Sequence, residues 1–258
     1  MLQKPEIRAR LDALLPLAEG FDRSWSFSAA GVEERALFFL PPTRPALTAL
    51  LAAAEGLGMS AATIAGFRAA LPGADALGLT LAQGGSVRLY LQYWERMVQR
   101  VLAGDLAPAP LYLGFKQFPD GTGRNDVYHC LPMAPEAEYR PVLEAALTGF
   151  GCAPEAVARL LEPLTPDRCI WTRTEGPGRA SWLATLRRAE IPARDLTAAL
   201  APVAGRPGVP ELLAALEQGA PLHIAGGEDG RKGAFLTFYV ETGAQAMTGF
   251  LDRLGHGG

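Results

Sequence analysis

Five pairs of short extended runs occur along this chain, and a helical-looking stretch follows each pair. The pairs lie near residues 23–40, 76–93, 110–132, 168–188 and 221–241. A unit repeated at roughly even intervals indicates one repetitive architecture, because each unit needs its neighbours to bury its apolar face. The repeat therefore predicts a fold assembled from five hairpins.

Alternation within the runs assigns each side chain to one of two faces. In the segment VRLYLQ at 87–92, aliphatic residues alternate with Arg88, Tyr90 and Gln92. The segment FLTFYVE at 235–241 alternates in the same way. Because successive side chains of a strand point to opposite faces, one face of these strands is apolar and the other is polar or aromatic.

Ala/Leu-rich segments with helical periodicity separate the hairpins. One, at 44–58, ends in glycine, as helices often do, and Ser60 is the expected N-cap of the next. The expected helices cover 44–58, 59–73, 135–151, 153–164, 193–205 and 242–255. The first 17 residues also suggest an amphipathic helix, and the charges interleaved there argue against a signal peptide.

Composition narrows the class of protein. The 258 residues are 49% hydrophobic and carry a formal net charge of −3, which argues against a nucleic-acid partner. No apolar run reaches the roughly 20 residues that span a bilayer, so no membrane association is expected. We expect a cytoplasmic protein with a single domain covering residues 1–258.

Ten antiparallel strands with one face against helices must cover their other face or close on themselves. Closure removes the sheet edges, and a ten-stranded barrel is wider than the eight-stranded kind that side chains just fill. The fold class predicted is α+β, a ten-stranded antiparallel barrel of five ββ hairpins inside an outer ring of helices. Its polar and aromatic inner face should line a cavity.

The predicted inner face combines cations with aromatic rings. It comprises Arg88, Tyr90, Gln92, Tyr112, Lys116, Tyr128, Trp171, Arg173, His223, Thr237 and Tyr239. Arginine and lysine bind phosphate oxygens through charge-assisted hydrogen bonds, and aromatic faces stabilise a carbocation. An allylic diphosphate needs both, because its ionisation yields diphosphate and an allyl cation.

On this pattern the chain resembles the ABBA prenyltransferases, whose αββα units surround a ten-stranded barrel called the PT barrel. The stretch from ERALFFL to LGLTLAQGGSVRLYLQYW is most similar in layout to the cyanobactin branch, which prenylates peptides. Arg88 and Tyr90 match the basic-x-Tyr strand pattern of the family. The resemblance implies that Arg88 binds diphosphate and that Tyr90 belongs to a tyrosine shield around the cation.

The other inward residues receive roles by the same resemblance. Lys116 and Arg173 are expected to bind diphosphate with Arg88. Tyr128, Tyr239 and His223 are catalytic candidates beside Tyr90, although a purely structural role is the alternative for His223. The substrate pocket would be completed by Tyr112, Trp171, Thr237 and Gln92.

Some features depart from the family pattern. The first hairpin shows no acidic residue at an inward strand position, where many members place an acceptor-activating carboxylate, although Asp22, Glu33 and Glu34 flank it. The general base is therefore left open. No DDxxD cluster is present, so Mg²⁺ dependence and any metal ligands are also open, and no organic cofactor is expected.

The sequence thus predicts a prenyltransferase that moves a dimethylallyl or geranyl group from its diphosphate to an acceptor. The acceptor is either a peptide side chain, as in ribosomal peptide biosynthesis, or an aromatic small molecule. The chain is shorter than most relatives, which suggests a wider mouth and favours the peptide. The alternative is a non-catalytic barrel that binds a hydrophobic or isoprenoid ligand or a partner protein.

Overall fold

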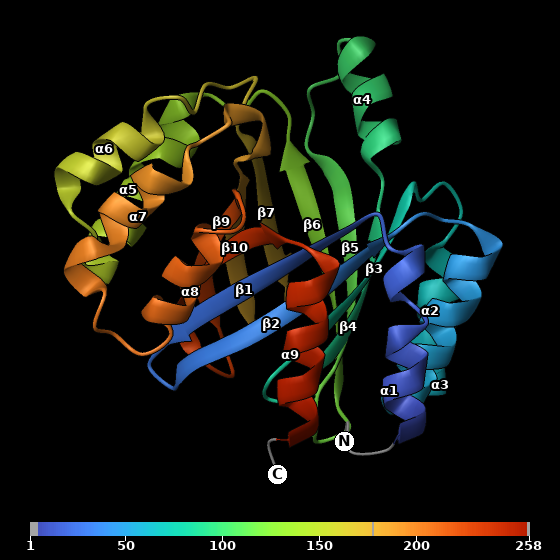
Figure 1. Cartoon of the computed structure of the whole chain (residues 1–258). Helices are drawn as coiled ribbons and strands as arrows, with labels where there is room; N and C mark the ends of the chain where they lie inside the picture. The colour runs from blue at the N-terminus through green and yellow to red at the C-terminus, as the bar shows by residue number, and fades with distance from the viewer. Residues whose placement is uncertain (1–4, 177, 257–258) are drawn as a thin grey trace.

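A closed ten-stranded antiparallel barrel forms the centre of the computed structural model, which describes residues 5–176 and 178–256 (Figure 1). Each strand pairs with its neighbours along the chain, and β1 pairs with β10 to close the barrel. The strands are β1 Gly20–Ser28, β2 Gly31–Leu40, β3 Ala76–Ala82, β4 Val87–Gln92, β5 Ala109–Gln117, β6 Gly123–Leu131, β7 Ile170–Gly176, β8 Arg179–Thr185, β9 Pro221–Asp229 and β10 Gly233–Thr242. The predicted fold class and all five hairpins are confirmed.

Helices connect the hairpins and surround the barrel. They are α1 Pro5–Asp12, α2 Arg44–Gly56, α3 Ala61–Ala70, α4 Trp94–Leu102, α5 Glu136–Phe150, α6 Pro154–Leu161, α7 Ala193–Leu200, α8 Val209–Leu216 and α9 Ala244–His256. Short 3₁₀ helices lie at Leu15–Leu17, Arg187–Ala189 and Ala201–Val203. Ser60 caps α3 as expected, because its Oγ accepts the amide of Thr63 at 3.2 Å.

The direction of the chain places the five hairpin turns at one end of the barrel. Every strand is antiparallel to its neighbours, so the turns within hairpins share one end and the helical connections start from the other. In Figure 1, α5 to α8 cover one side and α1 to α3 the other. Loop side chains far apart in sequence therefore meet at the hairpin end.

The apolar core is a shell between the barrel and its helices. On β1, Trp25 and Phe27 point outward into this shell, while Ser24 and Ser26 point inward. One cluster joins β7 to β10 with α5 to α8, and a second joins β2 to β4 with α1, α2, α3 and α9. Because the helices cover the aliphatic face, the barrel interior is left to polar and aromatic side chains.

Two inward assignments on β7 were wrong. Trp171 lies in the outer shell, 6.1 Å from the Tyr139 ring of α5, and Arg173 forms a 2.6 Å ion pair with Glu138 of the same helix. Thr172 and Thr174, both buried, take the inward positions. Alternation alone separates two faces without telling which one is the lumen, and here the large indole needs the apolar shell.

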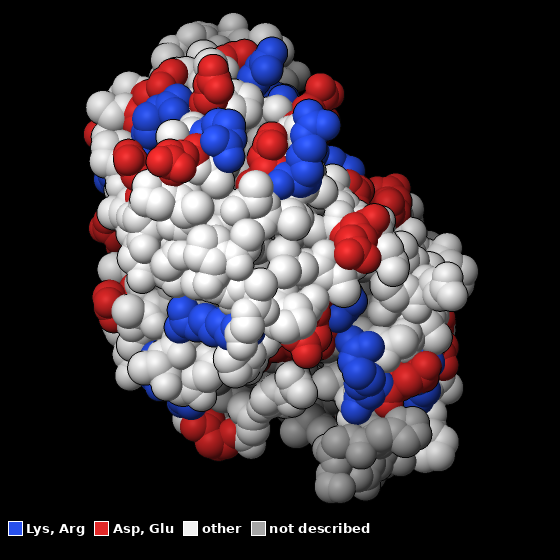
Figure 2. Space-filling view, turned by 60° about the vertical axis from the view of Figure 1, so that its left-hand side comes forward, with Lys and Arg blue, Asp and Glu red and all other residues white. Residues whose placement is uncertain are grey.

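The outer surface facing the reader in Figure 2 belongs to the side of α5 to α8. Charged side chains of both signs intermingle at its upper end, and an uncharged band crosses its middle. None of the helices in the described chain has the length and apolar character needed to cross a bilayer.

Candidate active site

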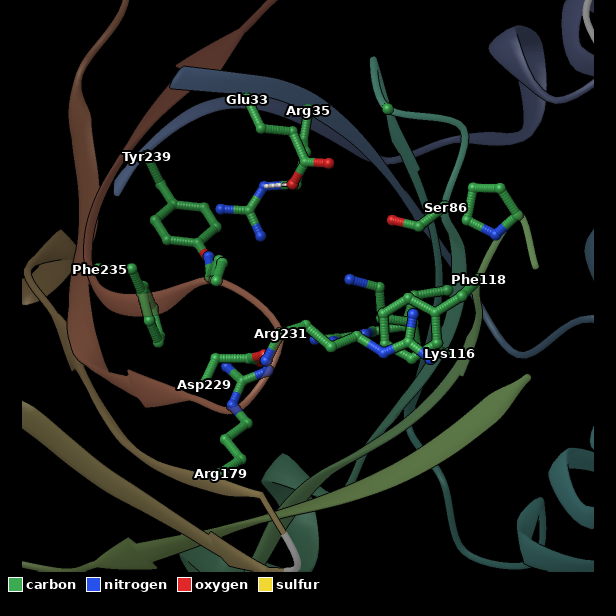
Figure 3. Close-up of a pocket in the computed structure, with 14 residues that line it drawn as sticks. Glu33, Arg35, Ser86, Lys116, Phe118, Arg179, Asp229, Arg231, Phe235 and Tyr239 are labelled. Atoms are coloured by element: carbon green, nitrogen blue, oxygen red, sulfur yellow. Dashed lines mark hydrogen bonds and ion pairs between the residues drawn. The ribbon is translucent and has the colours of Figure 1, made fainter. Parts of the chain in front are cut away.

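A cavity of about 200 Å³ opens at the hairpin end of the barrel (Figure 3). Tyr239 and Phe235 form one wall, Phe118 and Lys116 form the opposite wall, and Arg231 reaches between them. The lining residues are Glu33, Arg35, Gly84, Ser86, Arg88, Lys116, Phe118, Pro119, Arg179, Asp229, Arg231, Lys232, Phe235 and Tyr239. Strands supply most of them, and the hairpin turns supply the rest.

The lining is strongly basic. Six arginine or lysine side chains face only two carboxylates among these residues. Lys116 and Lys232 form no ion pair within the described chain; Lys232 Nζ donates to Ser26 Oγ at 2.7 Å, and Lys116 Nζ lies 4.5 Å from the Phe118 ring centroid. A cavity whose cations outnumber its carboxylates in this way suits an anionic ligand, and we call it the anion site.

The protonation of the two lysines reflects this crowding. Burial, reinforced by the neighbouring Arg88 and Arg35, lowers the pKa of Lys116 to about 7. Burial and Arg35 lower the pKa of Lys232 to about 6. An anion placed between them would favour the charged forms, so its binding should be accompanied by proton uptake at neutral pH.

Arg88 lies deeper and is fully engaged by the protein. Its Nη1 donates to Tyr90 Oη at 2.6 Å and to Tyr128 Oη at 2.7 Å, and its Nη2 lies 3.0 Å from Asp126 Oδ2. The guanidinium is buried and also lines the cavity floor. Arg88 therefore joins the anion site to the tyrosines below it.

Tyrosine rings form a layer next to this arginine. The Tyr90 and Tyr128 ring centroids are 6.1 Å apart, and Tyr112 meets Tyr128 edge-on at 6.2 Å. Tyr239 contacts the cavity on the other side of the barrel. The inward placement of these four tyrosines agrees with the sequence prediction, and their faces suit a carbocation.

His223 also points inward, packed edge-on against Tyr239 with the ring centroids 5.5 Å apart. Its Nδ1 lies 2.9 Å from Thr185 Oγ1. Burial, with a contribution from Arg187, lowers the pKa of His223 to about 4. The imidazole is therefore neutral at physiological pH, packed against Tyr239 and hydrogen-bonded to Thr185.

Thr237 and Gln92 face inward at different depths. Thr237 Oγ1 accepts from Arg35 Nη2 at 3.2 Å and donates to Ser26 Oγ, which holds Arg35 over the cavity. Gln92 pairs with Tyr112 across the strands and donates to Asp75 Oδ1 at 3.3 Å, near the end with the helical connections. Thr237 thus belongs with the anion site, and Gln92 lies away from it.

The expectation that the first hairpin lacks an inward acid was wrong. Asp22 shares the inner face of β1 with Ser24 and Ser26, and Glu33 lines the cavity from β2. The Asp22 side chain is buried and makes no hydrogen bond or ion pair in the described part of the chain. Burial raises the pKa of Asp22 to about 7. The charge of Arg35 acts in the opposite direction, and the charge of Glu241 raises the pKa further.

Several residues of the cavity were not predicted from sequence, and neither were two charged residues that pair with its lining. The lining residues are Glu33, Arg35, Arg179, Asp229, Arg231 and Lys232, and the two that pair with the lining are Arg124 and Asp126. Extending the alternation of Tyr128 backwards along β6 would have found Asp126 and Arg124. Arg231 and Lys232 follow no alternation because they lie in a turn, and only the closed barrel brings that turn over the cavity.

Gly114 gives the tyrosine layer its room. A Cβ at this position would lie 3.2 Å from Arg88 Cδ and 3.2 Å from Tyr90 Cε1, two side chains fixed by their hydrogen bonds. We expect Gly114→Ala to lower the free energy of unfolding by about 1–3 kcal/mol through overpacking. Urea unfolding measures this change.

Gly149 provides the matched control for that substitution. It is an exposed helical glycine in α5, and a Cβ there would meet nothing within 4 Å. Gly149→Ala should leave stability unchanged or raise it by up to about 1 kcal/mol, because alanine favours the helix. Equal effects of the two substitutions would contradict the tight packing inferred at Gly114.

The position of Arg173 leads to a second expectation. Arg173 and Glu138 are each 43% exposed on the outside of the barrel. Arg173→Ala should leave pyrophosphate affinity unchanged and cost at most about 1 kcal/mol of stability, as is usual for an exposed ion pair. Isothermal titration calorimetry tests this expectation. A large loss of pyrophosphate affinity would show that Arg173 belongs to the diphosphate site after all.

Carboxylate, histidine and cysteine side chains do not gather in groups of three or more suited to a metal ion anywhere in the described residues. The residues present therefore do not form a metal site of their own, and we derive no step through Mg²⁺. The anion site described above consists of arginine and lysine side chains.

The architecture defines a fold: a closed antiparallel barrel of five hairpins inside a ring of helices is the arrangement called the PT barrel. Solved structures agree. The 5-dimethylallyltryptophan synthase of Streptomyces coelicolor is similar with a TM-score of 0.50 and 16% identity, over 94% of this chain and 89% of that one.

Two further solved structures are similar with lower scores. The 6-dimethylallyltryptophan synthase of Micromonospora olivasterospora, in complex with DMASPP and Trp, has a TM-score of 0.47 and 15% identity over 95% of this chain and 87% of that one. NotF in complex with brevianamide F and DMSPP has a TM-score of 0.48 and 14% identity over 86% of this chain and 79% of that one. No family model and no curated protein matches the sequence. The similarity to the Streptomyces coelicolor structure confirms the predicted fold.

Proposed function

We propose that this protein is a prenyltransferase that transfers a dimethylallyl or geranyl group from its diphosphate to an aromatic small molecule. The observation that supports this most directly is that one barrel holds both a layer of tyrosines and two lysines, Lys116 and Lys232, that form no ion pair in the described chain. The lysines suit the diphosphate of an allylic donor, and the tyrosines suit the cation it forms. The fold is the one in which such enzymes occur.

The diphosphate would bind at the hairpin end. Lys116, Lys232 and Arg35 line the cavity. Arg231 reaches across it between the two walls (Figure 3). When the C–O bond of the donor breaks, its electron pair leaves with the diphosphate, and these cations stabilise the added charge. The positive charge then lies on the allyl group.

The allyl cation would lie against the tyrosine layer. Tyr90, Tyr128 and Tyr239 present ring faces or edges next to the anion site, each contributing about 0.5–2 kcal/mol to a cation close by. Tyr112 extends the layer further from the hairpin end. The rings also exclude water, which would otherwise capture the cation and release the prenyl alcohol.

The way the mouth is closed supports a small aromatic molecule as the acceptor. Arg231 of the β9–β10 turn bonds to Asp120 of the β5–β6 turn at 2.9 Å and to Thr122 Oγ1 at 2.6 Å, which joins two loops across the opening. A small aromatic acceptor suits this cavity of about 200 Å³ better than a peptide. An indole is the first choice, since the structure from Streptomyces coelicolor is a dimethylallyltryptophan synthase.

Asp22 is the best candidate for the acceptor base. After the aromatic carbon or heteroatom forms its bond to the prenyl group, the acceptor must lose a proton. Asp22 is an inward, buried carboxylate that makes no hydrogen bond or ion pair with the described residues, and its pKa of about 7 lets it accept a proton at neutral pH. The first hairpin thus supplies a candidate base.

The decisive experiment incubates the purified protein with dimethylallyl or geranyl diphosphate and a panel of acceptors, with and without Mg²⁺. The panel contains tryptophan, indole, tyrosine and a peptide carrying the same aromatic side chains. Product masses and released diphosphate should show transfer to a free aromatic compound. Binding of intact donor without release of diphosphate under all these conditions would instead identify a non-catalytic isoprenoid-binding barrel.

A further inference from the structure

One carboxylate inside the barrel is surrounded by arginines from three directions. Asp126 Oδ2 lies 3.0 Å from Arg88 Nη2 and 3.3 Å from Arg179 Nη1, and its Oδ1 lies 3.0 Å from Arg124 Nε. The side chain is 4% exposed. Three guanidinium groups converging on one buried anion is the arrangement expected around a phosphoryl group.

The surrounding charges show that this carboxylate only partly neutralises its neighbours. Arg124 also bonds to Asp229 Oδ2 at 2.9 Å, so three arginines share two carboxylates. Arg88 and Arg179 both line the cavity, next to the two lysines that have no carboxylate partner in the described chain. Figure 3 shows Arg179 reaching up into the cavity beside Asp229. Asp126 therefore borders the anion site without filling it.

We infer that Asp126 is an internal counter-ion that occupies the place of a second phosphoryl group among Arg88, Arg124 and Arg179, and so limits the negative charge that the cavity accepts. A phosphoryl group carries up to about two negative charges and three acceptor oxygens, against one charge for a carboxylate. Part of the positive charge of these arginines is thus neutralised by the protein's own carboxylate. This inference rests on the proposed diphosphate site and assigns Asp126 a specificity role in it.

The physical consequence is a competition between Asp126 and the ligand. The carboxylate repels a bound anion and also holds the guanidinium groups away from it. Removing one unit charge at this range inside a protein changes the affinity of an anion by about tenfold or more. Asp126→Asn keeps the size of the side chain, so the repulsion is removed with little change of shape.

The test measures binding of inorganic pyrophosphate and of inorganic phosphate by isothermal titration calorimetry. Relative to the original protein, Asp126→Asn should bind pyrophosphate about tenfold more tightly or better, with a smaller gain for phosphate, because the larger anion reaches more of the released arginines. The salt dependence of pyrophosphate binding should also become steeper. A merely structural role for Asp126 predicts the opposite, a loss of affinity.

Glu138→Gln is the matched control. It also removes one carboxylate from an arginine, Arg173, and changes the net charge equally, but on the outside of the barrel. Its pyrophosphate affinity should equal that of the original protein. A gain in both variants would indicate a general charge effect and overturn the role of Asp126.

The results separate this inference from the proposed function. Pyrophosphate binding and prenyl transfer by the original protein, with no gain in Asp126→Asn, would refute the inference alone. Absence of pyrophosphate binding in both proteins would refute the diphosphate site and the inference with it.

Three arginines left without Asp126 could prevent the variant from folding. In that case the inference predicts chemical rescue, because pyrophosphate should replace the missing carboxylate. Refolding in the presence of pyrophosphate should then restore the thermal transition of Asp126→Asn, while equal ionic strength of sodium chloride should not. Failure of pyrophosphate to restore folding would overturn the inference.

Discussion

Replacing Lys116 and Lys232 together with methionine is expected to weaken pyrophosphate binding by about 10²–10⁴-fold, since each charge-assisted hydrogen bond contributes about 1.5–3 kcal/mol. These are the cavity cations that have no carboxylate partner in the described chain, so their charge is directed at a ligand. Prenyl transfer should fall in parallel. Isothermal titration calorimetry with pyrophosphate measures the binding directly.

The pH dependence of binding checks the same assignment. The pKa values of Lys116 and Lys232 are lowered to about 7 and about 6, so both lysines are charged below pH 6 and lose their protons as the pH rises. Pyrophosphate affinity should therefore fall between pH 6 and pH 8 by this contribution. The double methionine variant should lack this part of the pH dependence. An unchanged affinity in that variant would contradict the anion site.

The unfolding temperature of the double methionine variant tells whether weaker binding comes from loss of the anion site or from misfolding. Methionine fills the space of a lysine stem without a buried charge, so the variant should unfold at the same temperature as the original protein or a higher one. The difference should be largest at acidic pH, where the two lysines are forced to be charged inside the barrel. A large drop in the unfolding temperature would attribute the lost binding to misfolding.

The second large effect is expected for Asp22→Asn. This substitution should reduce the rate of prenyl transfer by about 10²–10⁴-fold, as is typical when a general base is removed. Asp22 accepts a proton only when ionised, so the rate of the original protein should rise with pH through about 7. That rise should be absent in the variant. Pyrophosphate affinity should not change, because Asp22 does not line the anion site.

The same substitution should alter stability in a pH-dependent direction. The pKa of Asp22 is raised in the folded state, so the group contributes stability at low pH that is lost as the pH rises through about 7. Asp22→Asn should therefore raise the unfolding temperature at pH 8 and leave it nearly unchanged at pH 4. An activity loss accompanied by lower stability at pH 8 would point to a structural role instead.

The accuracy with which alternation predicted the inner face differs between strands. Alternation placed Arg88, Tyr90 and Lys116 on the inner face because apolar residues occupy the alternate positions before and between them on β4 and β5. It failed on β7, where the inward positions hold the small residues Thr172 and Thr174 and the large Trp171 lies outward, against the helices. It also failed at Asp22, because the acidic residue extends the Ser24–Ser26 alternation by one position beyond the expected start of the strand.

By itself the sequence determined the repeat, the closed barrel and the polar inner face, because period-2 patterns and turn residues act over a few neighbouring positions. Tertiary structure alone decided which charges face a ligand. Arg231, Lys232 and Asp126 come together through turns and strands more than 100 residues apart, and their partners depend on the register of the closed sheet. The register decides whether a carboxylate lies next to a given arginine and neutralises it. No local sequence pattern encodes that register.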